Sequence, residues 1–153
     1  MTPEQRLQEL GLVLPITPVP VANYVSWRFA GPLLFLSGQG PKLPDGSYRI
    51  GRLGLNTEVK QGYEDAKLTG LQLLAVAKAA LGELSRIEAV IKLLGMVNAE
   101  PEFAEHPKVI NGCSDLFVNV LGDAGRHARS AIGVGSLPNM MTVEIEAILL
   151  VRT

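Results

Sequence analysis

The sequence predicts an α+β fold in which two main helices pack on one face of a mixed β-sheet. The first observation is the order of patterns along the 153 residues: a short helix, two strands, a helix, a strand, a helix and two strands. The second is periodicity, because apolar residues recur every three or four positions in two segments and alternate in the others. The third is composition: 47% of the residues are hydrophobic but only 5% are aromatic, which predicts a core of Leu, Val, Ile and Ala.

Charge and hydropathy exclude several classes of protein. The formal net charge is -1 and no basic run is present, which argues against nucleic acid as the main partner. No apolar stretch approaches the roughly 20 residues that span a membrane, and the polar N-terminus lacks the features of a secretory signal. With Cys113 as the only cysteine there is no internal disulfide framework. These features predict a cytoplasmic protein without a membrane segment, and residues 1–153 are expected to form a single domain.

Residues 1–20 are expected to form an N-terminal helix followed by an extended arm. Thr2 can cap the helix, Pro3 suits the first turn, and Gln5 completes a capping box. The helix is expected to end before Gly11. Residues 14–20 contain three prolines, which cannot lie in a helix or in a central strand.

The middle of the chain predicts a hairpin and a long helix. Residues 23–30 and 33–37 have the composition of strands, joined by a tight turn at Gly31-Pro32. The glycines and proline of residues 38–41 are expected to end the second strand, and residues 47–56 form a loop that the sequence does not place. Helical periodicity covers residues 57–81, with Gly82 as the C-cap.

The remaining elements alternate between strand and helix. Residues 86–97 predict a strand rich in Ile and Val. A second helix is expected over residues 101–121, with a break near Pro107 and a stop at Gly122. Strands over residues 128–136 and 141–152, joined by a turn at residues 137–139, are expected to form a C-terminal hairpin.

Two charged residues of this C-terminal region are candidates for chemistry. Arg129 precedes a run of small residues, and an arginine at the mouth of such a space can hold a carboxylate in a two-point clamp. Glu144 shares a strand face with Thr142 and Glu146, and a carboxylate lining a pocket can position or activate a water molecule. Local composition alone favours ordinary roles: a surface salt bridge for Arg129 and a solvated strand face for Glu144.

The expected hairpin sets a geometric constraint on this pair. A symmetric turn at Pro138-Asn139 places Arg129 opposite Ile148, on the same face as Glu144 but about 13 Å along the strand. A small ligand cannot bridge that distance within one chain. Either the strand register differs, or Arg129 and Glu144 act together across a subunit interface.

Other polar residues are weaker candidates. The backbone N–H groups around Ser37 and Gly38 could bind an anion or a carbonyl oxygen, although the segment lacks the spacing of a nucleotide-binding loop. Asn111 could offer its amide to a ligand or lie on a helix surface. Tyr24, just before the first strand, is a candidate pocket residue.

The cysteine and the histidines are not expected to form a catalytic or metal site. Cys113 has no histidine near it in sequence, which favours a small core residue over a nucleophile. His106 and His127 are too sparse for a metal site.

A wider set of motifs, from about residue 21 to the end, resembles the RidA family, also called YjgF or endoribonuclease L-PSP. They are Tyr24, Leu36-Ser37-Gly38-Gln39, Val109-Ile110-Asn111, Ala128-Arg129-Ser130, Leu137-Pro138 and Val143-Glu144-Ile145-Glu146-Ala147. The first two dozen residues and the 45–60 loop are similar to a longer subgroup of this family whose function is poorly defined. The resemblance implies a chorismate-mutase-like α+β fold and a homotrimer with three sites at the subunit interfaces.

The resemblance also implies a reaction and site residues. RidA proteins hydrolyse reactive enamine or imine intermediates such as 2-aminoacrylate to a 2-oxo acid and ammonia, without a cofactor. Arg129 would clamp the substrate carboxylate and Glu144 would hold the attacking water. The backbone at Ser37 and Gly38 would contact the substrate, and Tyr24 and Asn111 would border the pocket.

The sequence departs from the family pattern at two positions beyond the arginine. Ala131 stands where a cysteine is common, and Gly133 replaces a larger and often acidic residue. A pocket that is roomier or differently shaped is therefore expected, with Ala131 among the residues that border the substrate. Two alternatives to the deaminase remain open: a non-catalytic protein that binds small carboxylates at the same cleft, and a ribonuclease or translation inhibitor. The near-neutral charge and the lack of a basic, aromatic surface disfavour the last.

Overall fold

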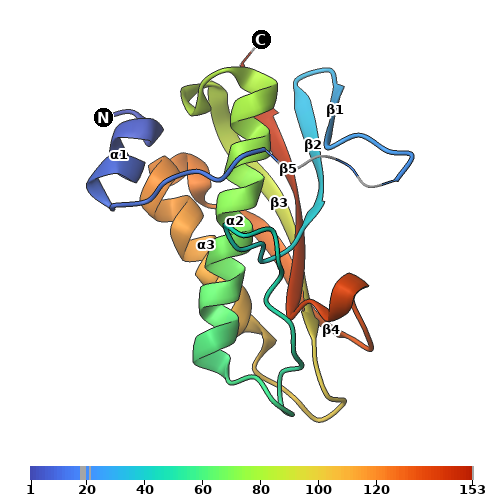
Figure 1. The fold of residues 1–153 in the computed structure, drawn as a ribbon. Helices are drawn as coiled ribbons and strands as arrows, with labels where there is room; N and C mark the ends of the chain where they lie inside the picture. Colours follow the sequence, from blue (N-terminus) through green and yellow to red (C-terminus); the bar gives the residue numbers. More distant parts are fainter. Residues whose placement is uncertain (18–19, 21, 153) are drawn as a thin grey trace.

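A five-stranded sheet is the centre of the fold in the computed structural model, which describes residues 1–17, 20 and 22–152 (Figure 1). The spatial order of the strands is β1-β2-β5-β3-β4. Strands β3 and β4 are parallel, and all other neighbours are antiparallel. The strands are β1 (Trp27–Ala30), β2 (Leu33–Gln39), β3 (Ile87–Asn98), β4 (Ala128–Val134) and β5 (Val143–Val151).

The two long helices lie side by side on one face of this sheet, as predicted (Figure 1). The α-helices are α1 (Pro3–Glu9), α2 (Val59–Leu81) and α3 (His106–Leu121), and the short 3-10 helices are η1 (Leu84–Arg86), η2 (Gly122–Gly125) and η3 (Pro138–Met140). No helix of the described residues is long and apolar enough to cross a membrane.

The helix ends follow the capping rules. The capping box between Thr2 and Gln5 is present in α1, and α2 ends at Gly82, whose φ of 87° suits glycine. Helix α3 begins at His106, five residues later than expected, with Pro107 in its first turn. The predicted break near Pro107 is instead the start of the helix. Proline has no backbone N–H group, and the first turn of a helix is the only turn in which that group has no hydrogen-bond partner within the helix.

The core forms where the buried face of the sheet meets α2 and α3. Alternate residues of β5 are buried there, and the residues between them, including Glu144, lie on the opposite face. Leu, Val, Ile and Ala supply most of the core, as the composition predicts. Cys113 is fully buried in it, and desolvation raises the pKa of its thiol, which fits a core residue rather than a nucleophile.

The first hairpin is confirmed, but its boundaries differ from the prediction. Strand β1 begins at Trp27, and β2 continues through Gln39, so residues 38–39 do not end it. Pairing of β2 with β5 is irregular between Leu36 and Gln39. Ser37 and Gly38 therefore lie within the strand at a bulge-like irregularity, a feature that the glycine content signals but does not place.

The predicted C-terminal hairpin is wrong. Strands β4 and β5 do not pair with each other, because β3 lies between them and pairs with both. Helix α3 carries the chain from the end of β3 back to its start, so β4 joins the sheet parallel to β3. Residues 135–142 then cross the end of β3, so that β5 pairs with β3 on the side opposite to β4.

Candidate functional site

The sheet register places Arg129 and Glu144 on opposite faces. Arg129 pairs with Leu93, which also pairs with Ala147, and these two partners are buried beneath the helices. Glu144 pairs with Met96, on the other face. Because β3 lies between their strands, the backbones of Arg129 and Glu144 are about 10 Å apart across the sheet. The three-residue offset between their β3 partners, Leu93 and Met96, adds about 10 Å along the strands. The expectation that they share a face is wrong, because it rested on the hairpin.

The Arg129 side chain is held against α3. Its Nη1 donates to Ser114 Oγ at 2.9 Å, and its Nη2 donates to the Pro107 carbonyl at 3.2 Å. Asn111 lies between these positions on the same stripe of the helix, because spacings of three and four residues share a face. Within the described part of the chain, the Asn111 side-chain amide makes no hydrogen bond, which leaves it for a ligand at this edge of the sheet.

Ala131 and Gly133 continue the Arg129 face of β4. Ala131 packs against the core, and the space beside Gly133 is filled by His106. A methyl group at position 133 would lie 2.5 Å from His106 Nε2. The His106 ring packs edge-on against Phe103, with centroids 5.1 Å apart. The expected roominess near Gly133 is thus occupied by an imidazole from α3.

Glu144 lines a separate cavity of about 300 Å³. The walls come from segments far apart in sequence and include Tyr24, Gly38, Tyr48, Pro138, Asn139 and Met141. Gly38 lies against the Glu144 carboxylate, since a methyl group there would lie 2.6 Å from Glu144 Oε2. Tyr24, Gly38 and Glu144, three of the residues that the family resemblance implies for the site, therefore lie at one cavity within one chain.

Burial sets the electrostatics of Glu144. The side chain is half-buried, and desolvation, with a smaller contribution from the negative charge of Glu146, raises the pKa of its carboxyl above the ordinary value. A carboxylate in this state is a stronger base than one in water. It is suited to accept a proton from a water molecule.

Ser37 contributes to a second cavity rather than to the Glu144 wall. This cavity, of about 540 Å³, lies on the open face of the sheet and shares Tyr24 with the first. The Ser37 hydroxyl donates to the Val25 carbonyl at 2.6 Å, and its backbone N–H donates to the Ser26 carbonyl at 3.0 Å. Both donors of Ser37 are used within the chain, so the expected binding of a ligand by its backbone N–H is not supported.

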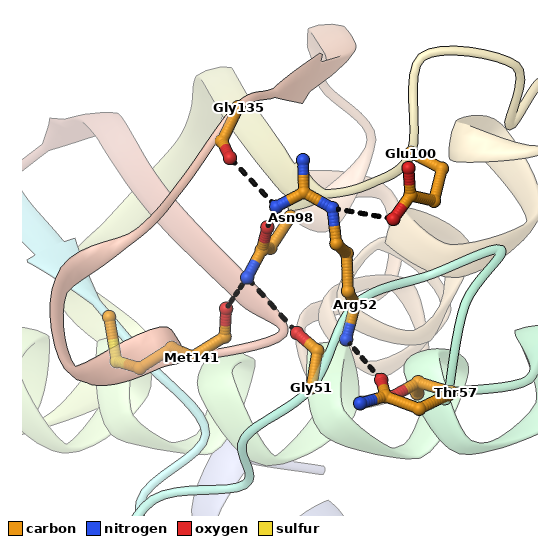
Figure 2. Close-up of polar contacts among 8 residues, drawn as sticks. Gly51, Arg52, Thr57, Asn98, Glu100, Gly135 and Met141 are labelled. Atoms are coloured by element: carbon orange, nitrogen blue, oxygen red, sulfur yellow. Dashed lines mark hydrogen bonds and ion pairs between the residues drawn. The ribbon is translucent and has the colours of Figure 1, made fainter.

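The loop over residues 47–56, which the sequence did not place, braces the Glu144 cavity. Figure 2 shows Arg52 reaching Glu100, Asn98 and Gly135: Nε lies 3.2 Å from the Glu100 carboxylate, and Nη1 donates to Asn98 Oδ1 at 3.1 Å and to the Gly135 carbonyl at 2.8 Å. The Asn98 amide donates in turn to the carbonyls of Gly51 and Met141.

These contacts hold a strained turn. Asn139 and Met140 have positive φ values of 55° and 57°, and Asn139 forms part of the cavity wall. A left-handed conformation costs about 1–2 kcal/mol for a residue such as Met, so surrounding bonds must compensate. The carbonyl of Met140 accepts from Gly51 N at 3.0 Å, which fixes the turn to the loop.

Sequence reasoning missed several residues of this arrangement. His127 precedes Arg129 by two residues, and strand spacing could have placed both side chains on one face. Ser114 follows Asn111 by three residues on the helix, which was a second usable signal. Arg52 and Asn98 had no local signal, because their partners are distant in sequence. No three His, Cys, Asp or Glu side chains of the described residues gather closely enough to hold a metal ion.

The open face of the sheet, which also carries Glu144, has exposed apolar side chains. Phe35 and Ile132 are 40% and 43% exposed, and Val25, before β1, is 55% exposed. No helix of the described chain covers this face, since α2 and α3 lie on the other side (Figure 1). Apolar surface gathered on one face is typical of a protein interface.

Comparisons with known proteins agree with this fold. A family described as YjgF/chorismate mutase-like, with a proposed endoribonuclease activity, matches residues 4–148. The chain is 43% identical over 143 residues to Protein TCP17 of Trypanosoma cruzi, covering 93% of this chain and 89% of that protein.

Two solved structures are similar over nearly the whole chain. Atu1372 of Agrobacterium tumefaciens, a protein of unknown function, is 45% identical with a TM-score of 0.92, and the match covers 98% of this chain and 92% of that one. A candidate endoribonuclease of Shewanella oneidensis is 36% identical with a TM-score of 0.95, covering 99% and 100%. Both matches include the N-terminal arm.

Proposed function

Because the chain belongs to the YjgF/chorismate mutase-like family, whose α+β fold it shares, we propose that it hydrolyses small imines that carry a carboxylate. The products would be a 2-oxo acid and ammonia. The observation that carries the proposal is the arrangement of its two charges. Arg129 is a braced cation with unused donors at one edge of the sheet, and Glu144 is a half-buried carboxylate at a cavity on the other face.

Arg129 would bind the substrate carboxylate. A guanidinium has five N–H donors, and subtracting the two bonds to Ser114 and Pro107 leaves three without a partner in the described part of the chain. Three donors suffice for a two-point clamp on a carboxylate. The Asn111 amide, on the same helix stripe, would add a neutral contact.

Glu144 would activate the water. The carboxylate takes a proton from water as the water oxygen bonds to the imine carbon, and the electron pair of the C=N bond moves to nitrogen. The proton held by Glu144 passes to that nitrogen, which gives a neutral tetrahedral amino alcohol. Glu144 then takes the hydroxyl proton as the C–O double bond forms and the C–N bond breaks, and it passes this proton to the departing nitrogen, which leaves as ammonia. An enamine substrate would first tautomerise to the imine. These steps need only water, the imine and Glu144.

The two residues would meet at a subunit interface. Within one chain they point away from each other on opposite faces, so one small ligand cannot contact both. We propose a homotrimer, as the family resemblance implies, in which Arg129 of one subunit faces Glu144 of its neighbour. The exposed apolar side chains of the open face support such an assembly, since packing them against neighbours would remove them from water.

A coupled assay tests the proposal. A pyridoxal-phosphate-dependent dehydratase or an amino-acid oxidase generates imines from several amino acids, and release of 2-oxo acid is followed with and without the protein. We expect faster release with the wild-type chain, a raised KM in Arg129→Lys and a loss of kcat in Glu144→Gln. Absence of any rate above background with a folded, oligomeric protein would contradict the proposed hydrolysis. Carboxylate binding without turnover would then favour the alternative function, a non-catalytic protein that binds small carboxylates at the same cleft.

A further inference from the structure

A chain of hydrogen bonds leads away from Arg129 into the protein. Arg129 Nη1 donates to Ser114 Oγ at 2.9 Å, and Ser114 Oγ lies 2.8 Å from His127 Nε2. His127 Nδ1 lies 2.6 Å from the carbonyl oxygen of Gly125. Ser114 belongs to α3, Gly125 to η2 and Arg129 to β4, so the chain ties together three elements around the guanidinium.

The partners determine the direction of each bond. A carbonyl oxygen only accepts, so the proton between His127 and Gly125 must be on Nδ1. In a neutral imidazole, Nε2 is then an acceptor, and the Ser114 hydroxyl must donate to it. This leaves the lone pairs of Ser114 Oγ for Arg129, which can only donate. Each of these hydrogen bonds thus has one possible direction, and the lone pairs of Ser114 Oγ are oriented to accept from the Arg129 guanidinium.

The surroundings favour this neutral form of His127. The imidazole is half-buried and packs edge-on against Phe117, with ring centroids 6.2 Å apart. Desolvation lowers the pKa of His127 below its ordinary value. The hydrogen bond to the Gly125 carbonyl opposes this shift, and the positive charge of Arg129 adds to it. Other charged groups nearby are engaged elsewhere: Asp115 accepts from Tyr63, and Asp123 pairs with Arg126.

We propose that Ser114 and His127 are positioning residues for Arg129. They fix the guanidinium plane so that its three remaining N–H groups are oriented before a carboxylate arrives, and this lowers the cost of ordering a long side chain on binding. The proposal rests on the proposed function in assigning Arg129 a carboxylate ligand. Neither residue contacts the substrate, so their effect should fall on binding rather than on the chemical step.

Four variants separate positioning from general structural roles. Ser114→Ala removes the acceptor of Arg129, and we expect KM to rise about tenfold with kcat nearly unchanged. His127→Asn can still donate to Gly125 but is too short to reach Ser114, so it should behave like Ser114→Ala. His127→Gln extends an amide oxygen toward Ser114 and should restore a KM near that of the wild type. Ser130→Ala is the matched control, because it removes a neighbouring strand hydroxyl that contacts Lys92.

Nitrogen NMR of the Arg129 guanidinium provides a readout that needs no ligand. In the wild type, hindered rotation should give separate signals for Nη1 and Nη2. These signals should average in Ser114→Ala and His127→Asn, and they should stay separate in His127→Gln and Ser130→Ala. Separate signals in Ser114→Ala, with an unchanged affinity for 2-oxobutanoate, would overturn the positioning role.

The same experiment distinguishes failure of the inference from failure of the proposed function. If Arg129→Ala leaves 2-oxobutanoate binding unchanged, the carboxylate clamp is wrong, but the guanidinium signals still decide whether Ser114 and His127 hold the side chain. If Arg129→Ala abolishes binding and Ser114→Ala has no effect on binding or on the signals, the clamp stands and the positioning role fails.

Discussion

At the scale of single residues, the Glu144 carboxylate depends on a glycine for its place. Gly38 leaves the space in which Oε2 lies, and any larger side chain at position 38 would enter it. The strand bulge that carries Gly38 thus presents bare backbone to the carboxylate. The lack of a side chain at position 38 is therefore as much a part of the candidate site as Glu144 is.

Gly38→Ala should displace the Glu144 carboxylate without unfolding the protein. The added methyl would lie 2.6 Å from Oε2, and the glutamate side chain can rotate away where a backbone could not. A displacement of about 1 Å can lower a rate by up to about 100-fold, so kcat should fall by about 10- to 100-fold.

The control for this variant is Gly135→Ala, where nothing lies within 4 Å of the added methyl. Thermal unfolding of both variants should match that of the wild type. An unchanged kcat in Gly38→Ala would show that the position of the carboxylate does not limit the reaction.

Glu144→Gln should remove activity and yet leave the fold at least as stable at neutral pH. The pKa of Glu144 is raised in the folded state, so the wild type loses stability as pH rises from the ordinary value of 4.5 through the raised value. Glutamine does not ionise and avoids this loss. The melting temperature of Glu144→Gln should therefore exceed that of the wild type by an amount that grows across that pH range and stays constant above it.

Melting curves of both proteins over this pH range measure the effect. A variant that is less stable than the wild type at neutral pH would mean that the ionised Glu144 stabilises the fold, contrary to the direction of its pKa shift.

At the scale of elements, the position of α3 depends on its close contact with α2. A methyl group at Gly112 would overlap the carbonyl oxygen of Tyr63, so the helix backbones approach more closely there than a side chain permits. Since α3 carries Asn111 and Ser114, this contact also sets the distance between the helix and the Arg129 side chain.

Gly112→Ala should destabilise the protein by about 1–3 kcal/mol, because the methyl meets backbone that cannot rotate away. Gly70 on α2 offers the matched comparison, since a methyl there would meet the side chains of Leu116 and Cys113 instead. Chemical denaturation should rank Gly112→Ala as less stable than Gly70→Ala. The reverse order would contradict the close helix contact.

The elements themselves were largely predictable from the sequence, but their pairing was not. Periodicity and capping residues located both long helices and the long strand β3, since these signals are local. The order of strands depends on where α3 returns the chain, and no local pattern in residues 128–152 distinguishes a hairpin from two strands flanking β3. The error mattered, because it put Arg129 and Glu144 on the same face.

The candidate site was predictable to a similar degree. The family motifs identified Arg129, Glu144, Tyr24, Gly38 and Asn111, but not that they form two separate groups in one chain. The contacts that His127 and Arg52 make behind these groups join residues that are distant in sequence but close in space. Their roles follow from tertiary contacts alone.

At the scale of the whole molecule, the protomer holds two groups of candidate site residues, the two halves of the proposed site, on opposite faces of the sheet. The Arg129 half lies at the edge of the sheet against α3, and the Glu144 half lies on the open face. Cyclic assembly is the simplest way to join the halves, because each interface then brings one of each together. We therefore propose that a complete site needs two chains.

Subunit mixing tests that claim most directly. Arg129→Ala and Glu144→Gln chains, each inactive alone, are co-expressed with different tags and purified for particles that contain both. In a mixed trimer, one interface joins an intact Arg129 to an intact Glu144, so we expect about one third of the wild-type activity. Mixed particles that remain as inactive as either variant alone would contradict it.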